Sequence, residues 1–385
     1  MKQDSPWYRA DIEGLRGIAV LSVVFFHFDY QWFSGGALGV DMFFVISGFL
    51  ITSLIVREQK QNTFSLSEFW SRRIRRILPA LTVFMLAISL YMYSENPPFS
   101  SFENVGEAIT TQSVFVSNIY FLHTVNLLEP ANSTRPEPLT HTWSLSVEEQ
   151  FYVIFPLLLI ILLSYSRNIT ITGLAVVTTT SFIFFIYLTE LDPFGNFPFS
   201  DHVYLNIIGG FYMFPARAWE LLLGSLGALV AIRLSPKGAR ALSASGALLI
   251  GVGLIVTIIL PGWERTLPVL GTLFIIIANT SSETPVKKFL SWSPLVWVGS
   301  ISYSLYLWHW PIYQFYREAH GYAEVPLHRS IGLLIVSLTI AAISYEFVEK
   351  PFLKKKNWNR KKVYLFGIGA MIITALAGIV IQLSS

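Results

Sequence analysis

Several ionisable residues interrupt stretches of this sequence that are otherwise apolar, and each is a candidate for chemistry. They are His27, Asp41, Glu148, Glu149, Arg217, Glu220 and His309. A neutral histidine can act as a general base or a nucleophile, and a nearby carboxylate can orient its ring. Counting residues from the nearest polar segment places all seven in the outer half or near the middle of a bilayer. We therefore expect one buried polar layer.

Each of these residues also has a simpler structural explanation. A single histidine within a span is often a structural residue with satisfied hydrogen bonds. Arg217 and Glu220 are three positions apart and can neutralise each other on one helix face. Glu148 or Glu149 can cap the N-terminus of a span, with Ser144 or Ser146 completing the cap, and Asp41 can cap the span after Gly39.

A second candidate site is the basic run SRRIRRILP at residues 71–79. Its members are Arg72, Arg73, Arg75 and Arg76. The first and third of them share one helix face, and the second and fourth share another. Anchoring to anionic lipid explains such a run. A clamp for the phosphates of a ligand also explains it, because arginine rather than lysine matches phosphate oxygens in pairs.

The composition shows what kind of element positions these residues. Of 385 residues 53% are apolar and 13% charged, and mean hydropathy is +0.54. These values exclude a disordered chain, a nucleic-acid-binding domain and an ordinary soluble enzyme. The absence of cysteine excludes disulfides, thiolate metal sites and cysteine nucleophiles. No cleavable signal peptide is visible.

The sequence predicts eleven membrane-spanning helices and thus an all-α integral membrane protein. The runs are 17–33, 38–56, 76–94, 147–165, 169–189, 207–232, 241–260, 266–281, 296–316, 330–348 and 363–382. The polar stretch 99–125 is expected outside the bilayer or at its surface. With the N-terminus in the cytoplasm, 22 of the 27 Lys and Arg fall in inner segments, four fall outside, and Arg217 lies within a span. This asymmetry supports eleven spans and an extracytoplasmic C-terminus.

Several motifs together resemble the membrane acyltransferase-3 family over roughly residues 7–353. They are YRADIEGLRGIAVLSVVFFHF, GGALGVDMFFVISGFLIT, FWSRRIRRILPAL, HTWSLSVEEQFYVIFP, SYSLYLWHWPI and SYEFVEKPF. The family includes bacterial O-antigen and peptidoglycan O-acetyltransferases. The resemblance implies a ten-helix bundle plus an eleventh helix in the bacterial inner membrane. It also implies an Arg-x10-His pair, Arg16 and His27, and an Arg-x-x-Arg motif that both Arg72/Arg75 and Arg73/Arg76 fit.

The resemblance implies a function as well. The family is thought to take an acyl group, acetyl by default, from cytoplasmic acyl-CoA and deliver it to a hydroxyl of an extracytoplasmic glycan such as lipopolysaccharide O-antigen. Acyl-CoA is then a donor substrate, and no permanently bound cofactor, metal or nucleic acid is expected. Besides the donor, the partners are the glycan or a lipid-linked glycan and the membrane lipids.

Residues 354–385 are expected to form a basic connector and the eleventh span. Many members that modify lipopolysaccharide continue beyond such a span into an extracytoplasmic SGNH-type hydrolase domain. We expect the sequence to be the membrane part of such a protein, with the SGNH domain acting in cis or in trans.

The predicted mechanism starts with CoA phosphates docking on the Arg72–Arg76 cluster, with Arg16 as a further candidate. His27 then acts as general base on the acceptor hydroxyl or as nucleophile carrying the acyl group. Asp41 or Glu149 would orient the His27 ring, and His309 or Arg217 would stabilise the oxyanion. The main alternative is a transporter or flippase for an acyl donor or lipid-linked glycan, without covalent transfer. A scaffold or sensor is a third class, which the many intramembrane charges disfavour.

Overall fold

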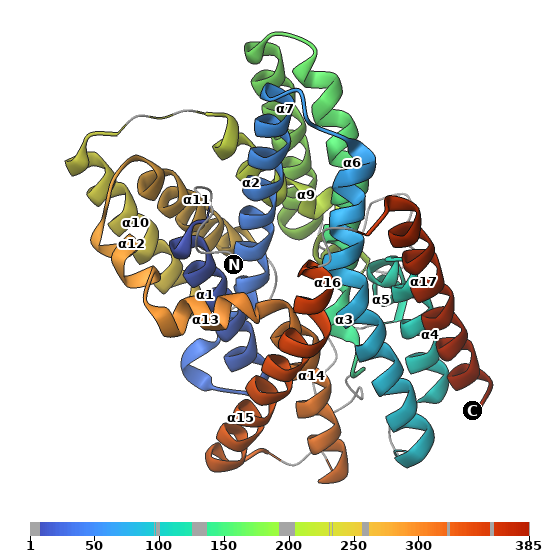
Figure 1. Ribbon diagram of the computed structural model, residues 1–385. Helices are drawn as coiled ribbons and strands as arrows, with labels where there is room; N and C mark the ends of the chain where they lie inside the picture. Colours follow the sequence, from blue (N-terminus) through green and yellow to red (C-terminus); the bar gives the residue numbers. More distant parts are fainter. Residues whose placement is uncertain are drawn as a thin grey trace. The chain divides into compact units, whose positions relative to one another are not determined.

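The structure is a computed structural model in which residues 8–95, 97, 101–124, 137–191, 205–230, 232, 234–255, 262–321, 324–354 and 358–384 are described. The described residues are 87% helical, and no strand occurs among them (Figure 1). The prediction of an all-α protein is therefore confirmed.

Contacts between residues divide the chain into two compact units. Unit 1 comprises the described residues within 1–57, 157–191 and 215–302. The helices lying wholly or mostly in it are α1 (Ala10–His27), α2 (Gly39–Lys60), α7 (Arg167–Ile186), α9 (Phe214–Leu229), α10 (Pro236–Ile255), α11 (Thr266–Ser281), α12 (Pro285–Leu290) and α13 (Ser293–Ser300). The short turns η1 (Gln31–Phe33), η2 (Gly36–Leu38), η4 (Tyr187–Leu191) and η5 (Trp263–Arg265) also belong to it.

Unit 2 comprises the described residues within 58–156, 192–214 and 303–385, so the division falls inside α6 at Pro156. Its helices are α3 (Leu66–Glu95), α4 (Phe102–Ser113), α5 (Ser117–Thr124), most of α6 (Trp143–Leu163), α8 (Leu205–Tyr212), α14 (Ser302–Ala319), α15 (Leu327–Ser344), α16 (Lys350–Lys354) and α17 (Arg360–Leu383). The turns η3 (Thr140–Thr142) and η6 (Tyr345–Glu349) complete it.

Seven helical stretches of the described chain are long and apolar enough to cross a membrane. They are Gly36–Lys60, Leu66–Glu95, Thr140–Leu163, Arg167–Thr189, Pro236–Ile255, Leu327–Lys354 and Arg360–Leu383. Each corresponds to one of the eleven predicted runs. Together with the helical content, these stretches make the protein a multi-pass membrane protein.

The four remaining predicted runs are helical too, but they are short, charged or broken. Helix α1 is 18 residues long and carries three charged side chains near its start, and α11 has only 16 residues. The run 207–232 is divided between α8 and α9, and the run 296–316 between α13 and α14. Three of these four runs hold candidate residues, since they contain His27, Arg217 with Glu220, and His309. Helices at all eleven runs are confirmed, whereas the number of crossings and the orientation stay predictions.

The eleventh predicted span, α17, packs on other helices of unit 2. It lies beside α4 (Figure 1), where a Cβ placed on Gly106 would come within 2.6 Å of the Gly378 carbonyl oxygen. Near its start, the Tyr364 hydroxyl donates to the Ser67 carbonyl of α3 at 3.0 Å. The last span therefore belongs to the packed body of unit 2, and the domain boundary at 353/354 stays a prediction.

Opposite faces of α17 differ in exposure, as expected for a helix at the lipid surface. Leu365, Ile368, Ile372 and Leu376 are exposed, and the face with Gly367, Ala370, Thr374 and Gly378 is buried. In water such a continuous apolar face would favour aggregation, but in a bilayer it contacts lipid tails.

Candidate active site

Glycines hold helix α1, which carries Arg16, against α12 and α13. A Cβ placed on Gly14 would lie 1.8 Å from Leu290 O, and one placed on Gly299 would lie 1.8 Å from Glu13 O. Both obstacles are backbone atoms, which cannot move aside cheaply. Small residues that bring two backbones together are typical of helix packing in membranes. The start of α1 is thereby fixed against the segment that leads to Ser302.

The Arg16 guanidinium is held by two short contacts within unit 1. Its Nη2 donates to Ser302 Oγ at 2.8 Å, and its Nη1 lies 3.4 Å from Glu13 Oε2. Arg16 is 9% exposed. A buried cation in this position needs such partners, because an uncompensated charge is costly away from water.

Arg16 and His27 share a face of α1 without touching each other. They are eleven residues apart, and His27 is the last residue of the helix. Eleven residues make about three turns and about 16 Å of rise. The Arg-x10-His spacing therefore places a cation and an imidazole at two levels of one helix face.

Asp41, which was predicted to orient an imidazole, joins a buried ionic network in unit 1. Arg265 Nη1 donates to Asp41 Oδ1 at 3.0 Å, and Arg217 Nη2 donates to the same oxygen at 3.2 Å. Arg217 also pairs with Glu220 at 3.2 Å, which confirms the predicted i, i+3 neutralisation. All four residues are buried. Two cations and two carboxylates in contact make a balanced network that ties α2, α9 and η5 together.

Arg265 was not predicted to be a site residue. It precedes an apolar run and was assigned to an outer segment, where an arginine is unremarkable. Only the packing of η5 against the start of α2 reveals that its guanidinium is buried on Asp41. Since two arginines engage the Asp41 carboxylate, its hydrogen bonds in the described structure give no support to the predicted pairing with His27.

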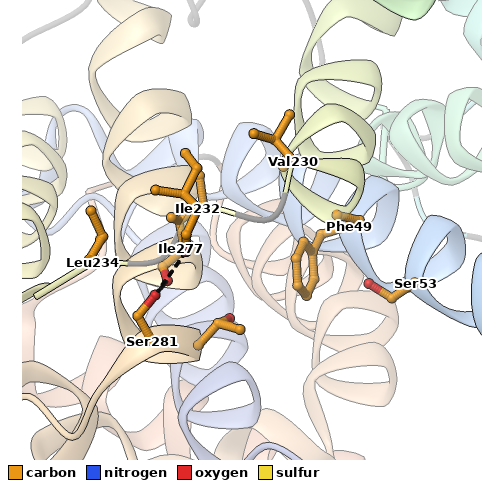
Figure 2. Close-up of a pocket in the computed structure, with 10 residues that line it drawn as sticks. Phe49, Ser53, Val230, Ile232, Leu234, Ile277 and Ser281 are labelled. Carbon is orange, nitrogen blue, oxygen red and sulfur yellow. Dashed lines mark hydrogen bonds between the residues drawn. The ribbon is translucent and has the colours of Figure 1, made fainter. Parts of the chain in front are cut away.

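Unit 1 also contains a cavity of about 650 Å³ near the middle of α2 and the C-terminal ends of α9 and α11 (Figure 2). Phe49 and Ser53 line it from α2, and Ser281 lines it from α11 and donates to Ile232 O at 3.1 Å. Its described lining is aliphatic, aromatic and hydroxyl-bearing and includes none of the predicted site residues.

The four arginines of α3 in unit 2 are not equivalent. Arg72 Nη2 pairs with Glu58 Oε2 at 2.9 Å. Arg75 Nη2 lies 3.4 Å from Glu68 Oε1, and its Nε lies 3.4 Å from Ser71 O. Carboxylates of the chain itself thus neutralise the Arg72/Arg75 pair.

Arg73 and Arg76 form no ion pair with a described residue. The Arg73 guanidinium lies 5.4 Å from the ring centre of Tyr152, a cation–π distance, and its Nε is buried without a described hydrogen-bond partner. Both arginines are close enough to Glu149 to interact electrostatically with it. Of the two Arg-x-x-Arg pairs, Arg73/Arg76 is therefore the one without an ion pair to a described carboxylate.

The predicted helix cap at Glu148 and Glu149 is wrong. Helix α6 begins at Trp143, so both glutamates lie in its second turn, where no orphan N–H groups remain to be capped. The Glu148 carboxylate instead accepts a hydrogen bond from the Tyr152 hydroxyl. Glu149 also lies within electrostatic range of Arg73 and Arg76, and its depth in the membrane stays a prediction.

The two serines proposed for that cap have other partners. Ser144 Oγ lies 2.6 Å from the Tyr306 hydroxyl, and Ser146 Oγ lies 2.9 Å from Ser117 Oγ. These side chains join α6 to α14 and α5 rather than to the first turn of α6.

His309 lies in α14 beside a histidine that the sequence analysis did not select. Its Nδ1 lies 3.0 Å from the Leu305 carbonyl, and its ring centre is 5.5 Å from that of His141. His309 is fully buried, and His141 is 4% exposed. The signal in the sequence was weak, because His141 precedes a predicted span instead of interrupting one.

The structure distributes the predicted site residues over both units. Arg16, His27 and Asp41 belong to unit 1, and the arginine cluster, Glu149 and His309 belong to unit 2. The single polar layer containing all of them stays a prediction. Among the described residues, no group of three or more His, Asp or Glu is arranged to hold a metal ion.

Comparison with known proteins identifies the family. The acyltransferase domain model of that family, Acyl_transf_3, matches residues 9–346. The chain belongs to the acyltransferase-3 family. It is 32% identical over 363 residues to the peptidoglycan O-acetyltransferase OatA of Listeria monocytogenes, covering 90% of this chain and 56% of that protein. It is 33% identical over 372 residues to the O-acetyltransferase OatA of Staphylococcus aureus, covering 92% of this chain and 58% of that protein.

The chain thus spans less than three fifths of the length of these relatives. No solved structure matches it.

Proposed function

We propose that the protein is a membrane O-acyltransferase that moves an acyl group, acetyl in the first instance, from cytoplasmic acyl-CoA to a hydroxyl of an extracytoplasmic glycan. The observation that carries the proposal is the match of the acyltransferase domain to residues 9–346. Both relatives are named as O-acetyltransferases. The placement of Arg16 and His27 on one face of α1 is compatible with this chemistry.

The donor site is proposed at Arg73 and Arg76. CoA carries a diphosphate and a ribose phosphate, and guanidinium groups bind phosphate oxygens through paired hydrogen bonds. Arg73 and Arg76 are free of ion pairs with described residues, whereas Arg72 and Arg75 have carboxylate partners. The charge asymmetry of the sequence supports a cytoplasmic position for this end of α3.

His27 supplies the imidazole of the proposed reaction. As a general base it takes the proton of the acceptor hydroxyl while the oxygen attacks the thioester carbonyl. The C–O bond forms, the C–S bond breaks, and the thiolate of CoA leaves with the proton. As a nucleophile it would first carry the acyl group itself and release it to the acceptor in a second step.

The acceptor proposed first is peptidoglycan, because the Listeria relative is named for it. Lipopolysaccharide O-antigen, which the motifs implied, is the second. The proposed location is the bacterial inner membrane, with the N-terminus in the cytoplasm and the C-terminus outside. An SGNH-type domain, in cis or in trans, is proposed to complete delivery to the glycan.

The test compares cells with and without the gene. Mass spectrometry of peptidoglycan and of lipopolysaccharide should show an O-acetyl group that depends on the gene and is lost in His27→Ala at matched protein level. Purified protein in lipid vesicles should release CoA thiol from acetyl-CoA. Because the chain has no cysteine, a thiol reagent then detects CoA alone. Movement of acetyl-CoA or lipid-linked glycan without thiol release would favour a transporter and contradict the proposal.

A further inference from the structure

One nitrogen of the His141 imidazole is buried without a hydrogen-bond partner among the described residues. Its Nδ1 is inaccessible to solvent and has no hydrogen-bond partner among the described residues. Buried side-chain acceptors are nearly always hydrogen-bonded, so an exception calls for an explanation. One explanation is a ligand whose hydrogen-bond donor binds this nitrogen transiently.

The other nitrogen sets the protonation of this ring. His141 Nε2 lies 3.1 Å from the Leu307 carbonyl oxygen, which can only accept a hydrogen bond. The proton of the neutral ring is thereby assigned to Nε2, and Nδ1 carries the lone pair. A lone pair on a neutral imidazole is the feature that a general base needs.

The position of the ring is fixed from two elements. The Tyr306 hydroxyl donates to the His141 carbonyl oxygen at 2.7 Å, and Ser144 Oγ lies 2.6 Å from the same hydroxyl. The His309 ring lies 5.5 Å away and is held through its own Nδ1 on the Leu305 carbonyl. Two imidazoles are thus locked side by side by backbone carbonyls of α14.

Polar side chains connect this pair with the arginines of α3. His141 and Tyr152 are eleven residues apart along η3 and α6, about 16 Å if helical, with Glu148 and Glu149 between them. At the far end Tyr152 faces Arg73. Helix α14 also contacts α3, since the Tyr303 hydroxyl of α14 donates to Ile77 O of α3 at 3.0 Å. The donor proposed to bind by its phosphates at Arg73 would extend along α6 toward His141.

We propose that His141 is a second imidazole base of this protein, and that its Nδ1 receives the hydroxyl proton of the acyl acceptor. The step breaks the O–H bond, places the proton on Nδ1, forms the C–O bond and breaks the bond from the acyl carbon to its carrier. The carrier, a CoA thiolate, leaves and takes up the proton. His141 is thus a second candidate for the acceptor proton, beside the general-base role proposed for His27. The inference rests on the proposed acyl transfer.

His141→Gln is the variant that tests it. The glutamine amide can still donate to the Leu307 carbonyl from the position of Nε2, but it offers no basic nitrogen at Nδ1. We measure CoA thiol release by purified protein in vesicles with acetyl-CoA and soluble peptidoglycan fragments. The expected result is a fall in kcat of at least about 100-fold with unchanged KM for acetyl-CoA. His320→Gln, on an exposed histidine of the α14 end, is the matched control and should behave as wild type.

The outcomes separate the two proposals. Wild-type protein without thiol release or glycan acetylation would overturn the proposed function. Active wild-type protein with an equally active His141→Gln variant would overturn the role of His141 alone.

A measurement on wild-type protein covers the case in which the variant fails to fold. Diethyl pyrocarbonate acylates unprotonated imidazole nitrogens, and mass spectrometry locates the product. We expect His141 to react, and to react more slowly when acetyl-CoA is bound. An unmodified His141 in protein whose exposed histidines are fully modified would contradict the proposal, because a site that admits an acceptor hydroxyl must admit this small reagent.

Discussion

Arg16 and His27 lie on one face of α1 about three turns apart, so they cannot contact the same atom of a substrate. A molecule that uses both must extend along the helix. Acyl-CoA has this form, with its phosphates far from its thioester. The two residues should therefore affect different kinetic constants.

The first prediction concerns this separation. His27→Ala should lower kcat by about 10²–10⁴-fold, the usual contribution of an acid–base group. Arg16→Gln should mainly raise KM for acetyl-CoA, because it removes a cation and not the base. Thiol release at varied acetyl-CoA concentration measures both effects. If KM is unchanged in Arg16→Gln, Arg16 does not bind the donor and has only a structural role through its contacts with Ser302 and Glu13.

The second prediction distinguishes the two arginine pairs. Arg73→Gln or Arg76→Gln should weaken acetyl-CoA binding about 10- to 100-fold, the value of one charge-assisted hydrogen bond. Arg72→Gln is the matched control and should change binding little, since its guanidinium already pairs with Glu58. Binding is measured by calorimetry on protein in vesicles. If the Arg72 and Arg73 variants weaken acetyl-CoA binding equally, the cluster acts only by general electrostatic attraction, and the specific site at Arg73 and Arg76 is contradicted.

The third prediction concerns the buried network of unit 1. Asp41→Ala leaves Arg217 and Arg265 buried without their shared carboxylate, and we expect a loss of about 3–5 kcal/mol of stability. Thermal unfolding in detergent measures it. Glu346→Ala is the control, because it breaks an exposed pair with Lys350, typically worth about 0–1 kcal/mol. Adding Arg265→Gln to Asp41→Ala should recover part of the loss.

The fourth prediction uses two glycines. Gly299→Ala should strongly destabilise the protein, because its Cβ would lie 1.8 Å from the Glu13 carbonyl oxygen. Gly251→Ala should be neutral or stabilising by up to about 1 kcal/mol, since no atom lies within 4 Å of its added Cβ and alanine favours helix. Melting temperatures of the two variants should move in opposite directions or differ widely. Equal melting temperatures would contradict the close packing of α1 on α13.

The fifth prediction concerns Glu137, which precedes η3 in the segment before α6. Burial of its carboxyl group, with a smaller effect of Glu107, raises the pKa of Glu137 from 4.5 to about 8. Between these values the folded state binds the extra proton, so stability should fall as pH rises from about 4.5 to 8. Glu137→Gln removes the titrating carboxyl group and with it this dependence of stability on pH. Its stability relative to wild type should therefore be greater at pH 8 than at pH 5, and an equal difference at both pH values would contradict the raised pKa.

Much of the fold could be predicted from local properties of the sequence. All eleven apolar runs are helical, and the family was recognised from its motifs. Breaks such as the one between α13 and α14 were not predicted, because the residues around Ile301 include neither a charge nor a proline. The helix cap at Glu149 was predicted wrongly because the start of α6 depends on η3 and its neighbours rather than on hydropathy.

By itself, the sequence determined that this is an all-helical membrane protein of the acyltransferase-3 family with candidate residues at Arg16, His27 and the α3 arginines. Apolar length and helical spacing are local, so they can be read along the chain. Only the tertiary structure decided that Arg73 and Arg76, unlike Arg72 and Arg75, have no ion pair with a described carboxylate, that Arg265 is buried on Asp41, and that His141 lies beside His309. These facts depend on contacts between residues up to 224 positions apart, which no local pattern contains.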